Sequence, residues 1–256
     1  MSAIAARRPS WPVGLLYGAI GIAWIVSLWA EATGSAAQFH HHALYESARP
    51  YWTAAGAVLL SWLVMTAAMM LPSSIGFVRL YAAAAANAPA FPLAFTLFLA
   101  SYFAVWALFA LAAFTGDMQL HRAVDAWPWL SAHANLIPAA TLAFAAIYQF
   151  TPLKDACLRV CRHPGVYLVR HYQRGVLNGL RVGFGHAMYC LGCCWALMLV
   201  MFAAGVAHLT WMAVLALLMV IEKTAPRGER FVAPVGIAFA VLAFVALLVP
   251  GILPSQ

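Results

Sequence analysis

Long apolar runs are the feature that most constrains what this chain can fold into. Most of them are about 20 residues long, the length a helix needs to cross the hydrocarbon core of a bilayer. In lipid the backbone must satisfy its own hydrogen bonds, so spanning segments are helices or closed barrels, and the alternating polarity of barrel strands is absent here. We therefore predict an all-α polytopic transmembrane helix bundle with about seven spans, over residues 12–30, 53–72, 91–115, 135–152, 183–204, 208–222 and 231–250.

Composition agrees with a membrane protein. The chain is 65% hydrophobic and 8% charged, which excludes an ordinary soluble domain. The net charge of +7 comes from the segments that flank the apolar runs, so it does not indicate a nucleic-acid partner. The first apolar run is long for a signal peptide, and we predict that it stays as an uncleaved span. With no repeat and no separate soluble domain in view, residues 1–256 are treated as one integral membrane domain.

The distribution of Lys and Arg predicts the orientation. If the N-terminus is inside, the inside segments contain twelve Lys and Arg residues and the outside segments contain only Arg49 and Arg122. Cytoplasmic loops carry this excess, so the pattern favours an N-inside, C-outside protein of the bacterial inner membrane. The outside run His40–His42 could capture a metal, although a solvated loop is the favoured interpretation.

A ladder of soft ligands occupies the run at 183–204. Six side chains project into an arc of roughly 140° at about 100° per residue: His186, Cys190, Cys193, Cys194, Met198 and Met201. Thiolate, thioether and imidazole groups select soft metals, Cu(I) above all. The ladder is too long for one ion, since His186 and Met198 alone lie about 18 Å apart along the helix axis. Cys190 and Cys194 form the best pair, with Cys193 on the adjacent edge.

A second soft cluster lies in the run at 53–72. Met65 and Met69 share a helix face there, and Pro72 is expected to end or kink the helix. Because this run crosses in the opposite direction, its inner half reaches the depth of Cys190. One of these methionines could therefore complete a metal site on the cysteines of the other helix. The alternative is that both methionines only pack in the core.

Two further pairs remain from the polar segments. Cys157 and Cys161 lie four residues apart in the inner segment 153–182, where they either pass a metal to a cytosolic partner or are plain reduced thiols. Glu222 and Lys223 end a span, and we interpret them as an interfacial ion pair, with an ion pathway as the alternative for Glu222.

Several motifs together resemble one family in their order and spacing. They are Trp62…Met65…Met69-Met70…Pro72, Tyr148…Cys157…Cys161…Pro164, Gly185…Cys190-Leu-Gly-Cys-Cys-Trp195…Met198 and Glu222-Lys223…Pro226. Over roughly residues 50–245 the chain is similar to an uncharacterised bacterial family of predicted metal-binding integral membrane proteins, domain of unknown function 2182. The resemblance implies the same membrane placement and metal binding, and it implies no established activity.

Taken together, the residues predict a membrane protein that binds copper as Cu(I), for copper transport, homeostasis or delivery. Its partners would be the lipid bilayer and a metallochaperone or membrane cuproenzyme. One alternative is a membrane thiol–disulfide oxidoreductase that uses Cys190 and Cys193, and another is a non-catalytic assembly subunit whose cysteines only pack. No nucleotide loop or hydrolytic triad is present, so ATP-driven pumping within this chain is not expected.

Overall fold

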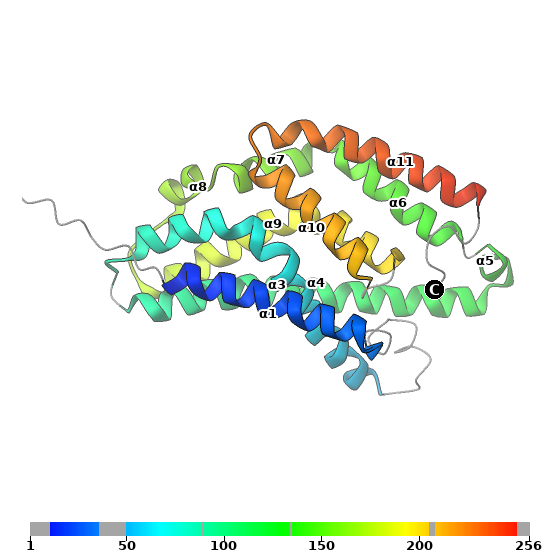
Figure 1. Cartoon of the computed structure of the whole chain (residues 1–256), viewed down its shortest axis with the longest axis horizontal. Coiled ribbons are helices and arrows are strands. Elements are labelled where there is room, and N and C mark those ends of the chain that lie inside the picture. The colour runs from blue at the N-terminus through cyan, green and yellow to red at the C-terminus, as the bar shows by residue number, and fades with distance from the viewer. Residues whose placement is uncertain (1–10, 36–49, 89, 134, 205–207, 250–256) are drawn as a thin grey trace, which may run out of the picture.

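Every regular element in the described part of the chain is a helix (Figure 1). The computed structural model describes residues 11–35, 50–88, 90–133, 135–204 and 208–249, so His40–His42 lie outside it. The helices are α1 (Trp11–Ala32), α3 (Tyr51–Ala85), α4 (Phe91–Ala126), α5 (Pro128–Ala132), α6 (Leu136–Gln149), α7 (Pro152–Arg162), α8 (Pro164–His171), α9 (Val176–Ala204), α10 (Leu209–Thr224) and α11 (Val232–Leu248), with a short 3-10 turn η2 (Gly228–Phe231) before α11. The predicted all-α fold is confirmed.

The number of membrane-length helices is lower than predicted. Within the described ranges, α1, α3, α4, α9 and the unit formed by η2 and α11 are long and apolar enough to cross a bilayer. A sixth span exists if α6 and α7, which are bent by 65° at their junction, count as one. The remaining candidate, α10, has 16 residues and is about 24 Å long, which is short of the hydrocarbon core. Seven spans and the N-inside orientation stay predictions.

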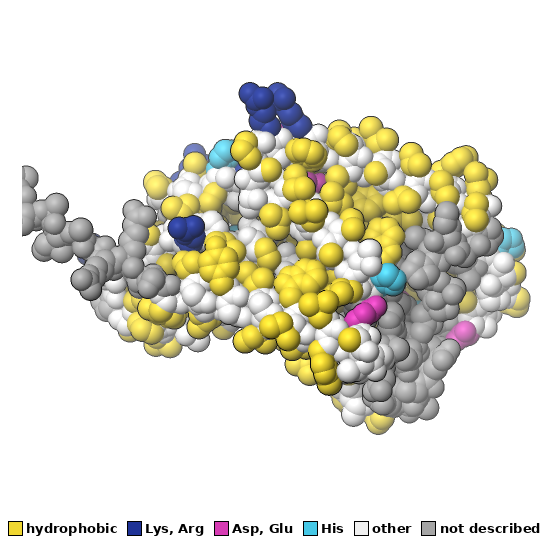
Figure 2. All heavy atoms as spheres, viewed as in Figure 1, with side chains coloured by type: hydrophobic (Ala, Val, Ile, Leu, Met, Phe, Trp, Pro, Cys, Tyr) yellow, Lys and Arg dark blue, Asp and Glu magenta, His cyan; other side chains and the backbone are white. Residues whose placement is uncertain are grey.

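The apolar surface agrees with a lipid environment. Figure 2 shows hydrophobic side chains spread over one face, while the Lys and Arg side chains visible on it lie toward its left half and upper edge. Large side chains such as Ile22, Ile25 and Leu108 are each about two-thirds exposed, which would be costly in water.

Helix α9 lies at the centre of the bundle. It packs most extensively on α4 and also contacts α6 and α7, while α1 packs on α3 and α11 packs on α6 (Figure 1). Close packing on α4 depends on two glycines of α9, since a Cβ at Gly179 would meet the Ala94 carbonyl and one at Gly183 would meet the Phe98 carbonyl. The small-xxx-small pair therefore brings the two backbones together.

Pro72 does not end its helix. The helix α3 continues to Ala85, and Figure 1 shows it changing direction along its length. Proline lacks the amide that would bond to the carbonyl four residues earlier, at Ala68. The indole of Trp24 on α1 donates to that carbonyl at 3.1 Å. A neighbouring helix thus supplies the missing donor, which is how prolines are tolerated inside membrane helices.

The predicted inner loop is mostly helical. Helix α7 begins directly after Thr151, whose hydroxyl accepts a hydrogen bond from the Lys154 amide at 3.3 Å, and Pro152 occupies the first helical position. The 65° bend after α6 turns α7 back onto α9. Helix α9 itself begins at Val176 rather than at residue 183.

Candidate metal centre

The soft-ligand face of α9 points into the bundle. The thiols of Cys190, Cys193 and Cys194 are at most 1% exposed, and His186 is 2% exposed. The sulfurs of Met198 and Met201 belong to residues that are fully buried further along the same helix. This inward orientation avoids the cost of leaving polar or reactive groups toward lipid without a partner.

Helix α3 faces this ladder with a stripe at helical spacing, formed by Met70, Ser73, Ser74 and Phe77. The Met70 Sδ lies 3.7 Å from Cys194 Sγ, and the Phe77 ring stacks on the His186 ring with centroids 3.8 Å apart. The two contacts show that α3 and α9 run antiparallel.

Met70 is the methionine that meets a thiol. Sequence reasoning named Met65 and Met69, which the structure buries in the same core, and missed Met70. The spacing of Met70 with the serines and Phe77, at i, i+3, i+4 and i+7, is the signal that could have found it.

A lysine enters the cluster from α10. The Lys223 Nζ donates to Cys190 Sγ at 3.2 Å and lies 3.8 Å from Cys194 Sγ. It also donates to Ser73 Oγ at 3.2 Å, and the residue is only 5% exposed. Sequence reasoning did not place this lysine near the thiols.

The predicted ion pair between Glu222 and Lys223 is wrong. The Glu222 carboxylate instead binds the Lys154 ammonium at 2.7 Å and accepts from Gln149 Nε2 at 3.1 Å. Adjacent side chains on a helix point about 100° apart, so the two charges face different neighbours. Both residues are buried rather than interfacial.

Cys190 is the thiol with the most donors around it. Besides Lys223, the Tyr102 hydroxyl lies 3.2 Å from its sulfur, and that hydroxyl is 3.3 Å from Ser74 Oγ. Nearby cations and hydrogen-bond donors are the surroundings in which cysteines act as thiolates, the form that binds metals.

Of the two cysteines of α7, Cys161 joins the same centre and Cys157 lies beside it. Cys161 Sγ lies 3.8 Å from Cys193 Sγ. Cys157 packs over Gly192, where an added Cβ would lie 2.5 Å from the Cys157 sulfur. Cys157 also lines an apolar cavity of about 530 Å³ together with Tyr148, Met188 and Trp195. The fold thus places both cysteines of the polar segment against α9.

The sulfur spacings suit a shared soft metal. With a metal–sulfur bond of about 2.3 Å, two sulfurs on one ion lie about 3.8 Å apart in a tetrahedral arrangement and about 4.6 Å apart in a linear one. The Cys161–Cys193 distance of 3.8 Å equals the tetrahedral value, and the Cys194–Met70 distance of 3.7 Å lies just below it. In the described part of the chain, no three His, Cys, Asp or Glu side chains converge as metal ligands. The sulfurs meet in pairs, and such a soft donor set fits Cu(I).

His186 is buried without a hydrogen-bond partner among the described residues. Neither ring nitrogen makes a hydrogen bond, and the ring lies between Phe77 and Tyr102, whose centroid is 5.4 Å away. An unpartnered buried imidazole is costly and needs a reason. Its position one turn before Cys190 leaves a ligand role open.

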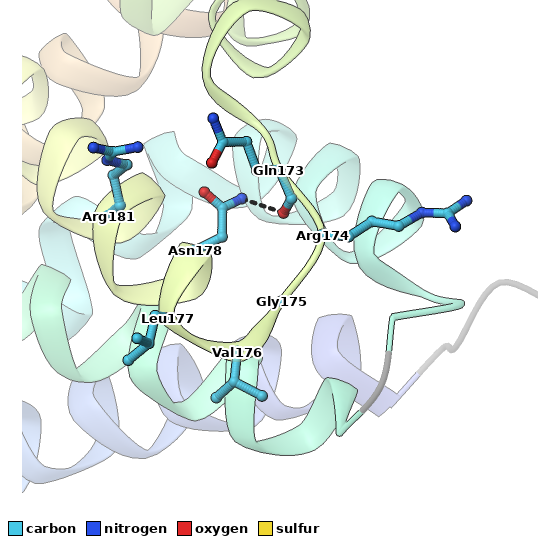
Figure 3. Close-up of a pocket in the computed structure, with 7 residues that line it drawn as sticks. All are labelled: Gln173, Arg174, Gly175, Val176, Leu177, Asn178 and Arg181. Atoms are coloured by element: carbon cyan, nitrogen blue, oxygen red, sulfur yellow. Dashed lines mark hydrogen bonds between the residues drawn. The ribbon is translucent and has the colours of Figure 1, made fainter.

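A separate hollow of about 420 Å³ lies at the junction of α8 and α9 (Figure 3). Asn178 donates to the Gln173 carbonyl at 2.5 Å there, and Arg174 points away from Arg181. None of its lining residues carries sulfur, so this hollow is not part of the metal centre.

Comparison with known proteins adds one match. A family model described as PpoB2, copper chaperone, matches residues 59–246, a range that includes all the cysteines and Lys223. No curated protein and no solved structure matches the chain. The match confirms the expectation of a copper-related protein, while membership of domain of unknown function 2182 stays a prediction. The chain belongs to the PpoB2 copper chaperone family.

Proposed function

We propose that this chain is an integral membrane copper chaperone that holds Cu(I) at the buried sulfur centre and passes it to a protein acceptor. The observation that carries the proposal is the meeting of three cysteines and one methionine from three helices, in the two close sulfur pairs Cys161–Cys193 and Cys194–Met70. The family match supports copper as the metal.

Roles within the centre follow from the contacts. We assign the principal ligands to Cys190 and Cys194, whose sulfurs share the Lys223 ammonium, and to Met70, whose sulfur contacts Cys194. The Cys161–Cys193 pair is the second position. Flanking positions go to His186, Met65, Met69, Met198 and Met201, which are buried in the same core. Glu222 is committed to Lys154 and is not a ligand.

Copper would enter from the cytosolic side. Helix α7 carries Cys161 to the centre and also carries Arg159 and Arg162 in its last turn, and such basic segments lie inside in bacterial membranes. A cytosolic metallochaperone is then the donor, and a membrane cuproenzyme is the acceptor. Reporter fusions after Ser131 and after Arg170 should report opposite sides of the membrane. If both report the same side, this entry route fails.

Metal analysis tests the proposal directly. Protein purified in detergent under reducing conditions should retain one or two copper ions per chain, an estimate from the number of sulfur donors and the few ligands Cu(I) accepts. Cys190→Ser and Cys194→Ser should each remove most of it, because a hydroxyl is a hard neutral donor. Met188→Leu, on the exposed side of α9, and Cys157→Ser serve as controls that keep the copper. Equal copper in the wild type and a Cys190/Cys193/Cys194 triple Ser variant would refute the proposal.

A second candidate function rests on the same 3.8 Å contact between Cys161 and Cys193. A disulfide bond is about 2.05 Å long, so a closing movement of roughly 2 Å would join α7 to α9. The apolar cavity beside Cys157 could hold a hydrophobic quinone, which would take two electrons and two protons from the thiols. Copper-free protein whose Cys161–Cys193 pair is oxidised by quinone, with quinol formed in equal amount, would favour this thiol–disulfide function over copper binding.

A further inference from the structure

Lys223 lacks the counter-ion that a buried lysine normally has. No carboxylate in the described part of the chain lies within 4.0 Å of its Nζ, although Lys154 nearby has Glu222 at 2.7 Å. A buried charge without an opposite charge is expensive. The atoms that surround the Lys223 ammonium are instead the sulfurs of Cys190 and Cys194 and the Ser73 hydroxyl.

These sulfurs become anionic when they bind metal, because metal ligation requires the thiolate form. Two thiolates around Cu⁺ carry a net charge of −1, which the ammonium of Lys223 balances to zero. Two thiolates around Zn²⁺ are already neutral, so the same ammonium would leave the buried centre with a charge of +1. That +1 is the charge the centre already carries with neutral thiols, so Zn²⁺ leaves the costly buried charge in place, whereas Cu⁺ removes it.

We infer that Lys223 is the specificity-determining residue of the centre, a fixed counter-ion that favours a monovalent over a divalent cation on Cys190 and Cys194. The inference rests on the proposed Cu(I) site and goes beyond it, since thiolates by themselves also bind Zn²⁺ well. Discrimination comes from charge, whereas the softness of the ligands sets only the general class of metal.

The position of Lys223 on α10 makes the charge hard to avoid. The side chain reaches α9 and α3 at once through Cys190, Cys194 and Ser73, and all of these residues are at most 9% exposed. The neighbouring Glu222 cannot neutralise it without abandoning Lys154. The ammonium therefore acts on whichever ion occupies the two thiolates.

Replacing the charge should change the preference for metals. In purified full-length protein, Lys223→Met should weaken Cu(I) binding relative to Zn(II) binding. The affinity ratio should shift by on the order of 10²- to 10³-fold, as for a unit charge about 4 Å away at an effective dielectric constant near 20. Lys223→Arg keeps the charge and should retain the wild-type ratio. Competition against a Cu(I) chelator and a Zn(II) chelator in the same detergent measures both affinities.

The outcomes separate this inference from the proposed function. A wild type that binds no Cu(I) overturns the proposed function. A wild type that binds Cu(I), with an unchanged Cu(I)/Zn(II) ratio in Lys223→Met, overturns only the role of Lys223. Lys223→Gln is a second neutral variant should the methionine variant fail to fold, and it carries the same expected shift. Arg181→Met, which removes an exposed charge elsewhere on α9, is the control that should leave the ratio unchanged.

Discussion

Two buried lysines of this bundle differ in their partners: Lys154 faces a carboxylate and Lys223 faces thiols. Lys154 forms an ion-pair centre with Glu222, and Gln149 binds the second carboxylate oxygen. Lys223 directly follows Glu222 on α10. It forms the sulfur centre with Cys190 and Cys194 and has no carboxylate beside it among the described residues.

The difference separates a structural role from a binding role. In the ion-pair centre the charges are matched, and Arg162 further ties the segment by donating to the carbonyls of Glu222 and Ala225 at 2.6 and 3.1 Å and pairing with Glu229 at 2.7 Å. The charges of this centre are therefore balanced without a ligand. In the sulfur centre the only groups that could balance the Lys223 ammonium are the thiols of Cys190 and Cys194, which become anionic when they bind a metal. Metal binding would therefore balance the charge of this centre.

The largest effect should come from breaking the ion-pair centre. Glu222→Gln leaves the Lys154 ammonium buried without its partner, which should lower the free energy of unfolding by about 3–5 kcal/mol. Copper per folded chain should stay at the wild-type level, because the sulfur contacts are untouched. Denaturant unfolding in detergent measures the first quantity, and metal analysis of the folded fraction measures the second.

A double variant sharpens this test. Lys154→Met combined with Glu222→Leu removes both charges and should recover most of the lost stability, since replacing a buried pair by apolar residues is often neutral. If the double variant loses copper while remaining folded, the two centres are coupled and the comparison between them is broken.

A smaller effect should follow from pushing α7 away from the sulfur centre. In Gly192→Ala the new methyl group would lie 2.5 Å from the Cys157 sulfur, so either the Cys157 side chain or α7 as a whole must shift on α9. Such overpacking typically costs about 1–3 kcal/mol. Oxidative cross-linking of Cys161 to Cys193 should become slower, while Cu(I) at Cys190 and Cys194 should remain. A cross-linking rate equal to that of the wild type would contradict a shift of α7 as a whole.

The smallest effect concerns the thioether. Met70→Leu removes a neutral soft ligand 3.7 Å from Cys194 Sγ and keeps the volume of the side chain. We expect Cu(I) affinity to fall by about 3- to 10-fold, well below the effect of losing an anionic thiolate ligand. Met69→Leu, on an adjacent face of α3, is the matched control. A larger loss for Met69 than for Met70 would reassign the methionine ligand to the position predicted from sequence.

The sequence predicts the helical class and the inward face of α9 well, since both follow from local patterns. Apolar run length identifies the long helices, and the spacing of Cys190 and Cys194 holds as soon as the segment is helical. The start of α7 was also open to prediction, because Thr151 followed by Pro152 is a helix-start signal.

The centre as a whole could not be predicted, because it depends on how distant segments pack. The 65° bend that brings Cys161 to Cys193 is a tertiary feature. The partner of Glu222 is also set by tertiary packing. Lys154 and Lys223 were both possible partners, and the packing of α7 on α10 selects Lys154. Local spacing favoured the adjacent residue and gave the wrong pair.

The composition of the sulfur centre from distant segments also fixes when it can exist during synthesis of the chain. Met70 leaves the ribosome first and the thiols of α9 follow, but Lys223 comes 29 residues after Cys194. At about 5–20 residues per second, the cysteines wait roughly 1.5–6 s before their lysine is made. A nascent chain that stops before α10 holds the thiols without the ammonium, so the proposed copper site is complete only once α10 has been made.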